Sequence, residues 1–129
     1  MKYRVWDKVE KKFTKDITVD QEGNLILTLN EENFPFGFRS LSEERYIISE
    51  CSGFKDKNGK DIYNGDIISY RYYGKNNLYE VVYDGKEWNL CNRVEKVLIS
   101  DVFKIRLKIA GNIYENSKLL EGKWQKNFC

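Results

Sequence analysis

Basic and aromatic side chains alternate along one short stretch of the sequence, SYRYYGKNNLY at 69–79. Its two cationic residues, Arg71 and Lys75, are suited to contacting phosphates. The tyrosines around them offer flat rings that stack on bases, a combination that small β-barrels use to bind nucleic acid. The stretch therefore supplies four candidate nucleic-acid-binding residues: Arg71, Tyr72, Tyr73 and Lys75.

A second basic row lies farther along the chain, within FKIRLKIAGNIYEN at 103–116. Strict alternation there predicts a strand with Ile105, Leu107 and Ile109 on one face. The other face would carry the remaining candidate binding residues: Lys104, Arg106 and Lys108. In the competing interpretation, alternate tyrosines of 69–79 line a core and the charges solvate its rim. The net charge of only +2 favours this competing interpretation, because dedicated polyanion binders are usually strongly basic.

Residue types that support enzyme catalysis are scarce. The chain contains no histidine, which removes Ser-His and Cys-His catalysis, histidine-based zinc sites and the commonest general base. No phosphate-binding Gly-rich loop, dinucleotide fingerprint or Gly-x-Ser-x-Gly turn is present. We therefore expect a protein that is not an enzyme and that needs no cofactor or metal.

Aspartates could support two further kinds of site, a calcium-binding loop and a pair of catalytic carboxylates. The stretch from Asp56 to Asp61 resembles a calcium loop, but its glycine comes at the fourth position and the twelfth residue is Ile67 instead of a bidentate Glu. Carboxylate catalysis would need Asp56, Asp61, Asp66 and Asp101 to converge. Aspartates in turns more often accept hydrogen bonds from local backbone N–H groups, and this is our expectation here.

Composition indicates a folded chain of one domain, or one domain with an appendage. Of its 129 residues, 41% are hydrophobic and 15% aromatic, which is ample for a core. The three cysteines, at 51, 91 and 129, are widely spaced, so we expect reduced thiols and a cytoplasmic location. Neither a signal peptide nor a membrane-spanning segment is evident.

Short strands separated by turns dominate the expected secondary structure. Asn58-Gly59 and Asn64-Gly65 suit tight turns that need a positive φ, and we expect Asp66 to bond backbone amides beside the second. Asp84-Gly85 is expected to join the two strands of a hairpin. The apolar spacing in 93–103 predicts a helix, and 116–129 reads as a frayed helix capped by Asn116. Strands are expected within these segments: 3–7, 11–19, 21–29, 45–53, 60–63, 66–73, 76–90 and 103–116.

The fold class predicted from these elements is mainly β, with a small barrel and one or two short helices. We expect residues 1–49 to form an N-terminal β segment packed on a barrel of residues 50–129 with a C-terminal tail. Exposed sheet edges and apolar patches would favour a homo-oligomer. The predicted core consists of Val5, Ile62, Ile67, Val82, Leu107, Ile109 and Ile113.

Three stretches resemble the YopX family of phage and prophage proteins. YRVWDKVEKKF at 3–13 is similar to the amino-terminal Arg-x-Trp-Asp of that family. SGFKDKNGKDIYNGDII at 52–68 resembles its Thr/Ser-Gly-Leu-x-Asp-x-Asn-Gly segment followed by Ile-Tyr-x-Gly-Asp-Ile/Val. IAGNIYENSKLL at 109–120 is similar to its Gly-Asn-Ile-Tyr-Glu-Asn close. Phe54 replaces the usual leucine, and Ser117 stands where proline commonly follows.

The resemblance implies a phage origin and an SH3-like barrel in the C-terminal half, without an established activity, cofactor or site residue. Fold alone does not give function. We therefore expect a non-enzymatic accessory module that binds a host or phage protein. The alternative is a small-barrel nucleic-acid-binding protein that uses the basic and aromatic residues named above.

Overall fold

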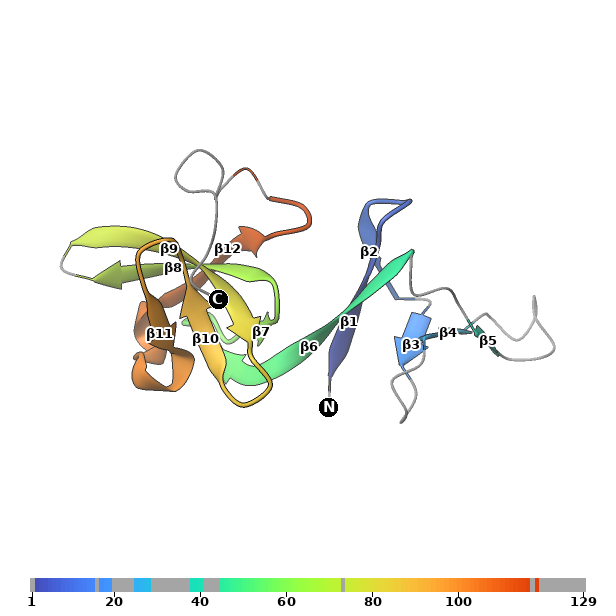
Figure 1. Ribbon diagram of the computed structural model, residues 1–129, viewed down its shortest axis with the longest axis horizontal. Coiled ribbons are helices and arrows are strands. Elements are labelled where there is room, and N and C mark those ends of the chain that lie inside the picture. Colours follow the sequence, from blue (N-terminus) through green and yellow to red (C-terminus); the bar gives the residue numbers. More distant parts are fainter. Residues whose placement is uncertain are drawn as a thin grey trace. The chain divides into compact units, whose positions relative to one another are not determined.

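The computed structural model describes residues 2–15, 17–19, 25–28, 38–40, 45–72, 74–116 and 118. The chain divides into two compact units, residues 1–50 and 51–129, and each is described by itself. Strands dominate both units and helices occur only as two single 3-10 turns in the described residues, so the predicted mainly β class is confirmed (Figure 1).

The first unit contains two small antiparallel sheets. In one, β1 (Tyr3–Asp7) lies between β2 (Lys12–Thr14) and the first half of β6 (Tyr46–Lys55). The other sheet has the order β3-β4-β5, formed by Ile17–Val19, Leu25–Thr28 and Phe38–Ser40. Val5 and Ile17 are buried together, and the half-buried Tyr46 and Ile48 pack against them.

An ion pair between a buried aspartate and a partly exposed arginine fixes the turn after β1. Asp7 is buried, and its Oδ1 accepts hydrogen bonds from the backbone N–H of Val9 at 2.9 Å and of Glu10 at 3.1 Å. Arg45 donates to both oxygens of Asp7, through Nε at 3.0 Å and Nη2 at 2.9 Å. The Arg45 hydrogen bond is the main reason why the pKa of Asp7 falls from 3.8 to about 2.

This pair predicts acid sensitivity. A carboxyl whose pKa is lower in the folded state stabilises the fold above its unfolded pKa, and this stabilisation is lost as pH falls towards the folded value. Asp7→Asn should therefore be less stable than the wild type at pH 7, with the difference shrinking between about pH 4 and pH 2. Urea unfolding at pH 7, 4 and 2.5 measures this, with the exposed Asp101→Asn as control. An equal difference at all three pH values would contradict the prediction.

The second unit is built on a five-stranded antiparallel sheet of order β11-β10-β9-β8-β12. Strands β8 (Asp66–Tyr72), β9 (Lys75–Tyr83), β10 (Trp88–Cys91) and β11 (Lys96–Leu98) form a meander, and β12 (Leu107–Asn112) returns to pair with β8. Among the described residues no ladder joins β11 to β12, so the sheet is a half-barrel, and its SH3-like character stays a prediction. Strand β7 (Asp61–Tyr63) pairs with the second half of β6.

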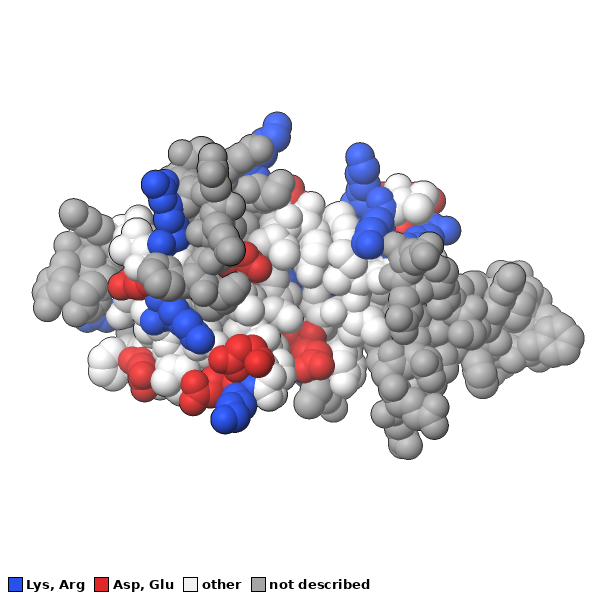
Figure 2. All heavy atoms as spheres, in the orientation of Figure 1, with Lys and Arg blue, Asp and Glu red and all other residues white. Residues whose placement is uncertain are grey.

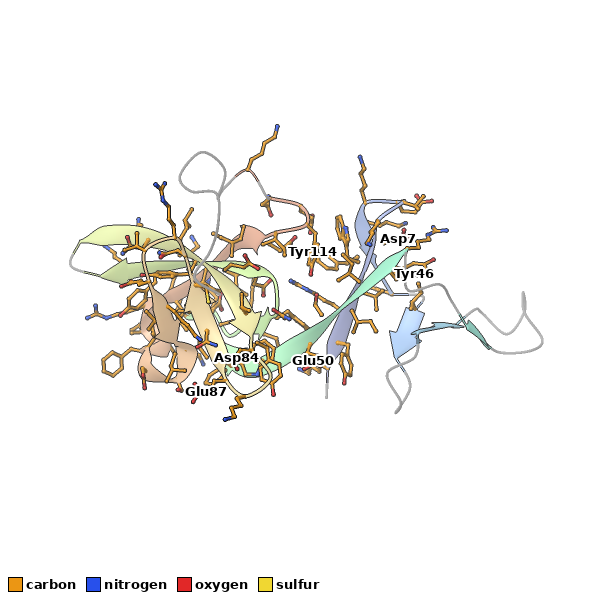
Figure 3. All side chains as sticks on the ribbon, in the orientation of Figure 1. Asp7, Tyr46, Glu50, Asp84, Glu87 and Tyr114 are labelled. Carbon is orange, nitrogen blue, oxygen red and sulfur yellow. The ribbon has the colours of Figure 1, made fainter. Side chains whose placement is uncertain are left out.

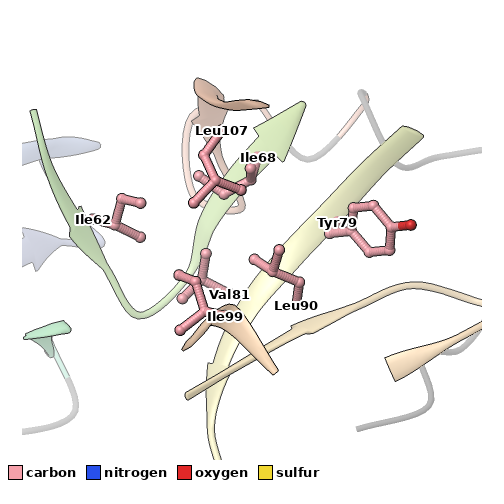
Figure 4. Packing of buried hydrophobic residues seen from close by; sticks show 7 residues of the cluster. All are labelled: Ile62, Ile68, Tyr79, Val81, Leu90, Ile99 and Leu107. Carbon is pink, nitrogen blue, oxygen red and sulfur yellow. The ribbon is translucent and has the colours of Figure 1, made fainter. Parts of the chain in front are cut away.

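The core of this unit lies on one face of the sheet. Alternation along β8 turns Ile68 and the half-buried Tyr70 towards it. Tyr79 is buried as well, and its hydroxyl, at the edge of the cluster in Figure 4, donates to Glu95. Burial and this carboxylate raise the pKa of Tyr79. The fully buried cluster comprises Ile62, Ile68, Tyr79, Val81, Leu90, Ile99 and Leu107.

Most of the predicted core residues are buried. Val5, Ile62, Ile67 and Leu107 are 2% exposed or less. The other three predicted members are only half-buried: Val82, Ile109 and Ile113.

The three predicted turns have the expected backbone. Gly59, Gly65 and Gly85 have φ values of +80°, +90° and +95°, a region that strains residues with a Cβ. Beside the second turn, the buried Asp66 accepts a hydrogen bond from the backbone N–H of Tyr63 at 2.7 Å, as expected.

The helix predicted over 93–103 is wrong. This segment instead forms β11 and a 3-10 turn, η1 (Ile99–Asp101). Asn92 Oδ1 accepts hydrogen bonds from the N–H groups of Val94 and Glu95 at 2.8 Å each, which begins a turn and leaves Val94 77% exposed. A short apolar run fits strand and helix about equally well, and here pairing with β10 decides it.

The alternation predicted from residue 105 onward also fails at its start. A second 3-10 turn, η2 (Lys104–Arg106), precedes β12, so Ile105 is 77% exposed and does not share the core face with Leu107. The helix predicted over 116–129 lies outside the described residues, apart from 116 and 118.

Two further predictions concern cysteines and membranes. Cys51 is free, but Cys91 is disulfide-bonded, so the expectation of reduced thiols is wrong for Cys91. The part of the chain that the structure describes contains no helix of the length and apolarity needed to cross a membrane.

Candidate functional site

The outer face of β8 and β12 brings together residues from both predicted basic rows. Lys108 lies opposite Ser69 in the ladder between these strands, and Leu107 lies opposite Tyr70. Because alternate residues of a strand face opposite sides, Ser69 and Arg71 lie on the face away from the core. Asn76 of β9 is the cross-strand partner of Arg71 and shares that face.

These side chains line a groove of about 510 Å³. Of its eight described lining residues, four are Lys or Arg and none is Asp or Glu. Ser69 and Asn76 add neutral hydrogen-bonding groups, and Ile105 adds an apolar one. The described lining comprises Lys57, Ser69, Arg71, Gly74, Asn76, Ile105, Arg106 and Lys108.

Lys57 reaches the groove because the turn before β7 is tied to β12. The buried Asp56 accepts hydrogen bonds at Oδ1 from the N–H groups of Asn58 and Lys60, both at 2.9 Å, and at Oδ2 from that of Ile109 at 3.2 Å. The N–H of Lys57 itself donates to the carbonyl of Leu107 at 2.8 Å. Burial acts to raise the pKa of Asp56, but these N–H donors outweigh it and the pKa is lowered.

The four cations of the groove form no ion pair with the described acidic residues. Three of the described acidic residues pair elsewhere, as Arg45–Asp7, Lys55–Asp61 and Lys96–Asp84. In Figure 2, several acidic side chains of the second unit lie along its lower edge, where Figure 3 labels Asp84 and Glu87. Hydrogen bonds from the N–H groups of Glu87 and Lys86 lower the pKa of Asp84 to about 2. Although the net charge of the chain is only +2, every charged residue described in the groove lining is therefore positive.

The structure separates the predicted binding residues into three groups. Arg71, Arg106 and Lys108 line the groove. Lys104 instead lines a second hollow of about 290 Å³ together with Lys55, because the η2 turn removes it from the row. The side chains of Tyr72 and Lys75, and all of residue 73, lie outside the described part of the chain.

Sequence reasoning missed Lys57 as a site residue. Its neighbours in the turn explain why: Asp56, Asn58 and Gly59 suggest only a turn, and nothing local places Lys57 beside a strand that begins fifty residues later.

Metal-binding and carboxylate chemistry find no support among the described residues. No group of three or more Cys, Asp or Glu side chains in this part of the chain is placed to hold a metal ion. Asp56 and Asp66, two of the four aspartates considered for catalysis, are buried and accept hydrogen bonds from backbone N–H groups.

Comparison with known proteins identifies the family of the chain. The model of the YopX protein family matches residues 2–121. The chain belongs to the YopX family. No curated protein is similar enough to count as a relative.

Two solved structures share the YopX fold of this chain. EF1440 from Enterococcus faecalis is 24% identical, with a TM-score of 0.64, and the match covers 93% of this chain and 97% of that one. The protein yopX from Bacillus subtilis is 17% identical, also with a TM-score of 0.64, over 92% of this chain and 97% of the other. At these identities the likeness concerns the fold alone.

The YopX stretches of this chain serve its fold. In the Gly-Asn-Ile-Tyr-Glu-Asn close, Asn112 Oδ1 accepts hydrogen bonds from the N–H groups of Tyr114 at 3.0 Å and Glu115 at 2.8 Å. The N–H of Ile113 donates to the carbonyl of Gly65, next to which the ring of Tyr114 also lies. These contacts from the Gly-Asn-Ile-Tyr-Glu-Asn segment therefore stabilise the Asn64-Gly65 turn in the 52–68 stretch. Of the four groove cations only Lys57 lies in these stretches, at a position that the motif leaves open.

Proposed function

We propose that this YopX-family protein is a non-enzymatic binding module whose groove holds the phosphate backbone of a nucleic acid. The observation that carries the proposal is the lining, whose described residues include four cations and no acidic side chain. This reverses the preference that net charge alone suggests, because a local field acts on a ligand at close range whatever the total charge.

The lining fits phosphates chemically. Arg71 and Arg106 present planar guanidinium groups that bind phosphate oxygens in pairs, while Lys57 and Lys108 act as compact positive charges. The hydroxyl of Ser69 and the amide of Asn76 supply neutral donors of the kind that often contact nucleic-acid backbones. Such contacts hold a backbone without reading its sequence.

A binding role for a host or phage protein is the competing proposal. It shares the non-enzymatic character, and a strongly acidic protein surface would suit the same groove. The nucleic-acid-binding proposal and the protein-binding proposal both include an accessory role in phage growth, which the resemblance to the YopX family supports. A direct binding measurement separates them.

Binding should depend steeply on salt. Neutralising each phosphate of a single strand releases counterions and adds about 0.7 to the slope of log K against log salt. If all four cations each neutralise one phosphate, affinity should fall about fiftyfold between 50 and 200 mM salt. Arg71→Ala with Lys108→Ala should bind more weakly and lose only about sevenfold over the same range. Fluorescence anisotropy of labelled DNA and RNA measures both slopes.

The matched control is Lys8→Ala with Lys86→Ala. It removes the same charge from two exposed lysines that do not line the groove and should leave the slope unchanged. Absence of binding at 50 mM salt would overturn the proposal. A specific acidic protein captured from host lysate in the same conditions would then favour the competing version.

A further inference from the structure

Two large apolar side chains are exposed on the segment that leads into the basic groove. Phe103 is 73% exposed and Ile105 is 77% exposed, and Ile105 lines the groove. Phe103 comes two residues before Ile105 and three before Arg106, which also lines the groove. A single exposed apolar residue is ordinary, but two on a segment that supplies lining residues to a basic groove need an explanation.

The backbone that carries these two residues is fixed at both ends. Ile99 and Leu107, each 2% exposed, anchor the segment in the core. Between them, the N–H of Val102 donates to the carbonyl of Ile99 at 3.2 Å, and that of Arg106 donates to the carbonyl of Phe103 at 2.9 Å. The backbone of Phe103 is therefore held next to that of Arg106, which lines the groove.

Phosphate contacts alone do not use apolar side chains. In a duplex the bases are stacked inside and the backbone meets the protein, whereas a single strand exposes base faces that stack on aromatic rings. A groove whose cations form no ion pair with the described acidic residues, lined by the exposed Ile105 and preceded in the chain by the exposed ring of Phe103, matches the single strand in both respects.

We infer that the groove binds single-stranded nucleic acid, with Phe103 and Ile105 contacting bases while Lys57, Arg71, Arg106 and Lys108 contact phosphates. The inference rests on the proposed function and narrows its ligand. Stacking of this kind tolerates any base, so the binding should show little sequence preference.

Anisotropy titrations at 50 mM salt test it with labelled dT15, labelled U15 and a 15-base-pair DNA duplex. Loss of one stacked base should weaken single-strand binding about tenfold, with a range of about five- to 150-fold, in Phe103→Ala. Duplex binding by this variant should stay within twofold of the wild type. Phe103→Tyr keeps a ring and should bind dT15 nearly as well as the wild type.

The control is Val94→Ala, because Val94 is as exposed as Ile105 but does not line the groove. Ile105→Ser provides a second test should Phe103→Ala misfold, and it should weaken binding of the single strands but not of the duplex. Binding of dT15 or U15 that exceeds duplex binding and is weakened by Phe103→Ala supports the inference, and the stronger of the two single strands identifies the class of ligand.

The possible failures are distinguishable. Equal affinities for single strands and duplex, both insensitive to Phe103→Ala, would overturn this inference and leave the phosphate-binding groove intact. Absence of binding to all three probes would remove the proposed function, and the inference with it.

Discussion

Gly65→Val is expected to lower the free energy of unfolding by about 2–5 kcal/mol, a large share of the stability of a small domain. Two costs add at this position. Gly65 has a φ of +90°, where a β-branched residue is strained. A Cβ there would also lie 3.1 Å from Cε2 of Tyr114, so the ring must move. Urea unfolding followed by circular dichroism measures the loss.

Gly59→Val separates the two costs. Gly59 has a similar φ of +80°, but a Cβ would meet nothing within 4 Å, so only backbone strain of about 1–3 kcal/mol is expected. Repeating Gly65→Val in a Tyr114→Ala background should reduce its cost to that of Gly59→Val. Equal costs for the two single substitutions would show that the Tyr114 contact does not constrain residue 65.

Asp56→Ala is expected to destabilise the second unit by about 2–4 kcal/mol and to weaken nucleic-acid binding as well. The substitution deprives three backbone N–H groups of a charged acceptor, including that of Ile109 on β12. The turn then loses a link that holds Lys57 at the groove. Urea unfolding and the dT15 titration measure the two effects.

Asp56→Asn and Asp101→Ala complete this experiment. Asp56→Asn keeps one acceptor oxygen and should cost less than Asp56→Ala, whereas the exposed Asp101→Ala should cost little. Because the folded pKa of Asp56 is lowered, its contribution is present at neutral pH and declines as pH falls below about 4. Full stability of Asp56→Ala with unchanged dT15 binding would show that this carboxylate does not position the groove.

Local chemistry explains which parts of the fold the sequence predicts. Asn58-Gly59 and Asn64-Gly65 specify their turns through local sequence alone, because few residue types readily adopt a positive φ. Strong alternation predicts β8 and β9 equally well. The helix over 93–103 fails because its apolar spacing suits either structure, and the deciding partner, β10, is recognised only once the sheet is formed.

The candidate site shows the same difference between features set by local sequence and features set by contacts distant in the chain. Arg71 and Lys108 were predictable because each lies in an alternating strand. Lys57 was not, since its place depends on a hydrogen bond between Asp56 and Ile109, which are 53 residues apart. Lys104 was assigned to the wrong surface because one 3-10 turn interrupts the alternation, and such short turns leave little trace in a sequence.

The return of β12 to the first strand of the meander has a consequence for synthesis on the ribosome. Strands β8 to β11 can pair in order as they emerge, because each follows its partner in the sequence. The ladder between β8 and β12 has to wait until residue 112 has left the exit tunnel. Until then β8 lacks its second partner strand, so a nascent chain stalled before β12 exposes an aggregation-prone edge at Ile68. Ribosomes that pause in this interval should therefore recruit chaperones to the nascent chain.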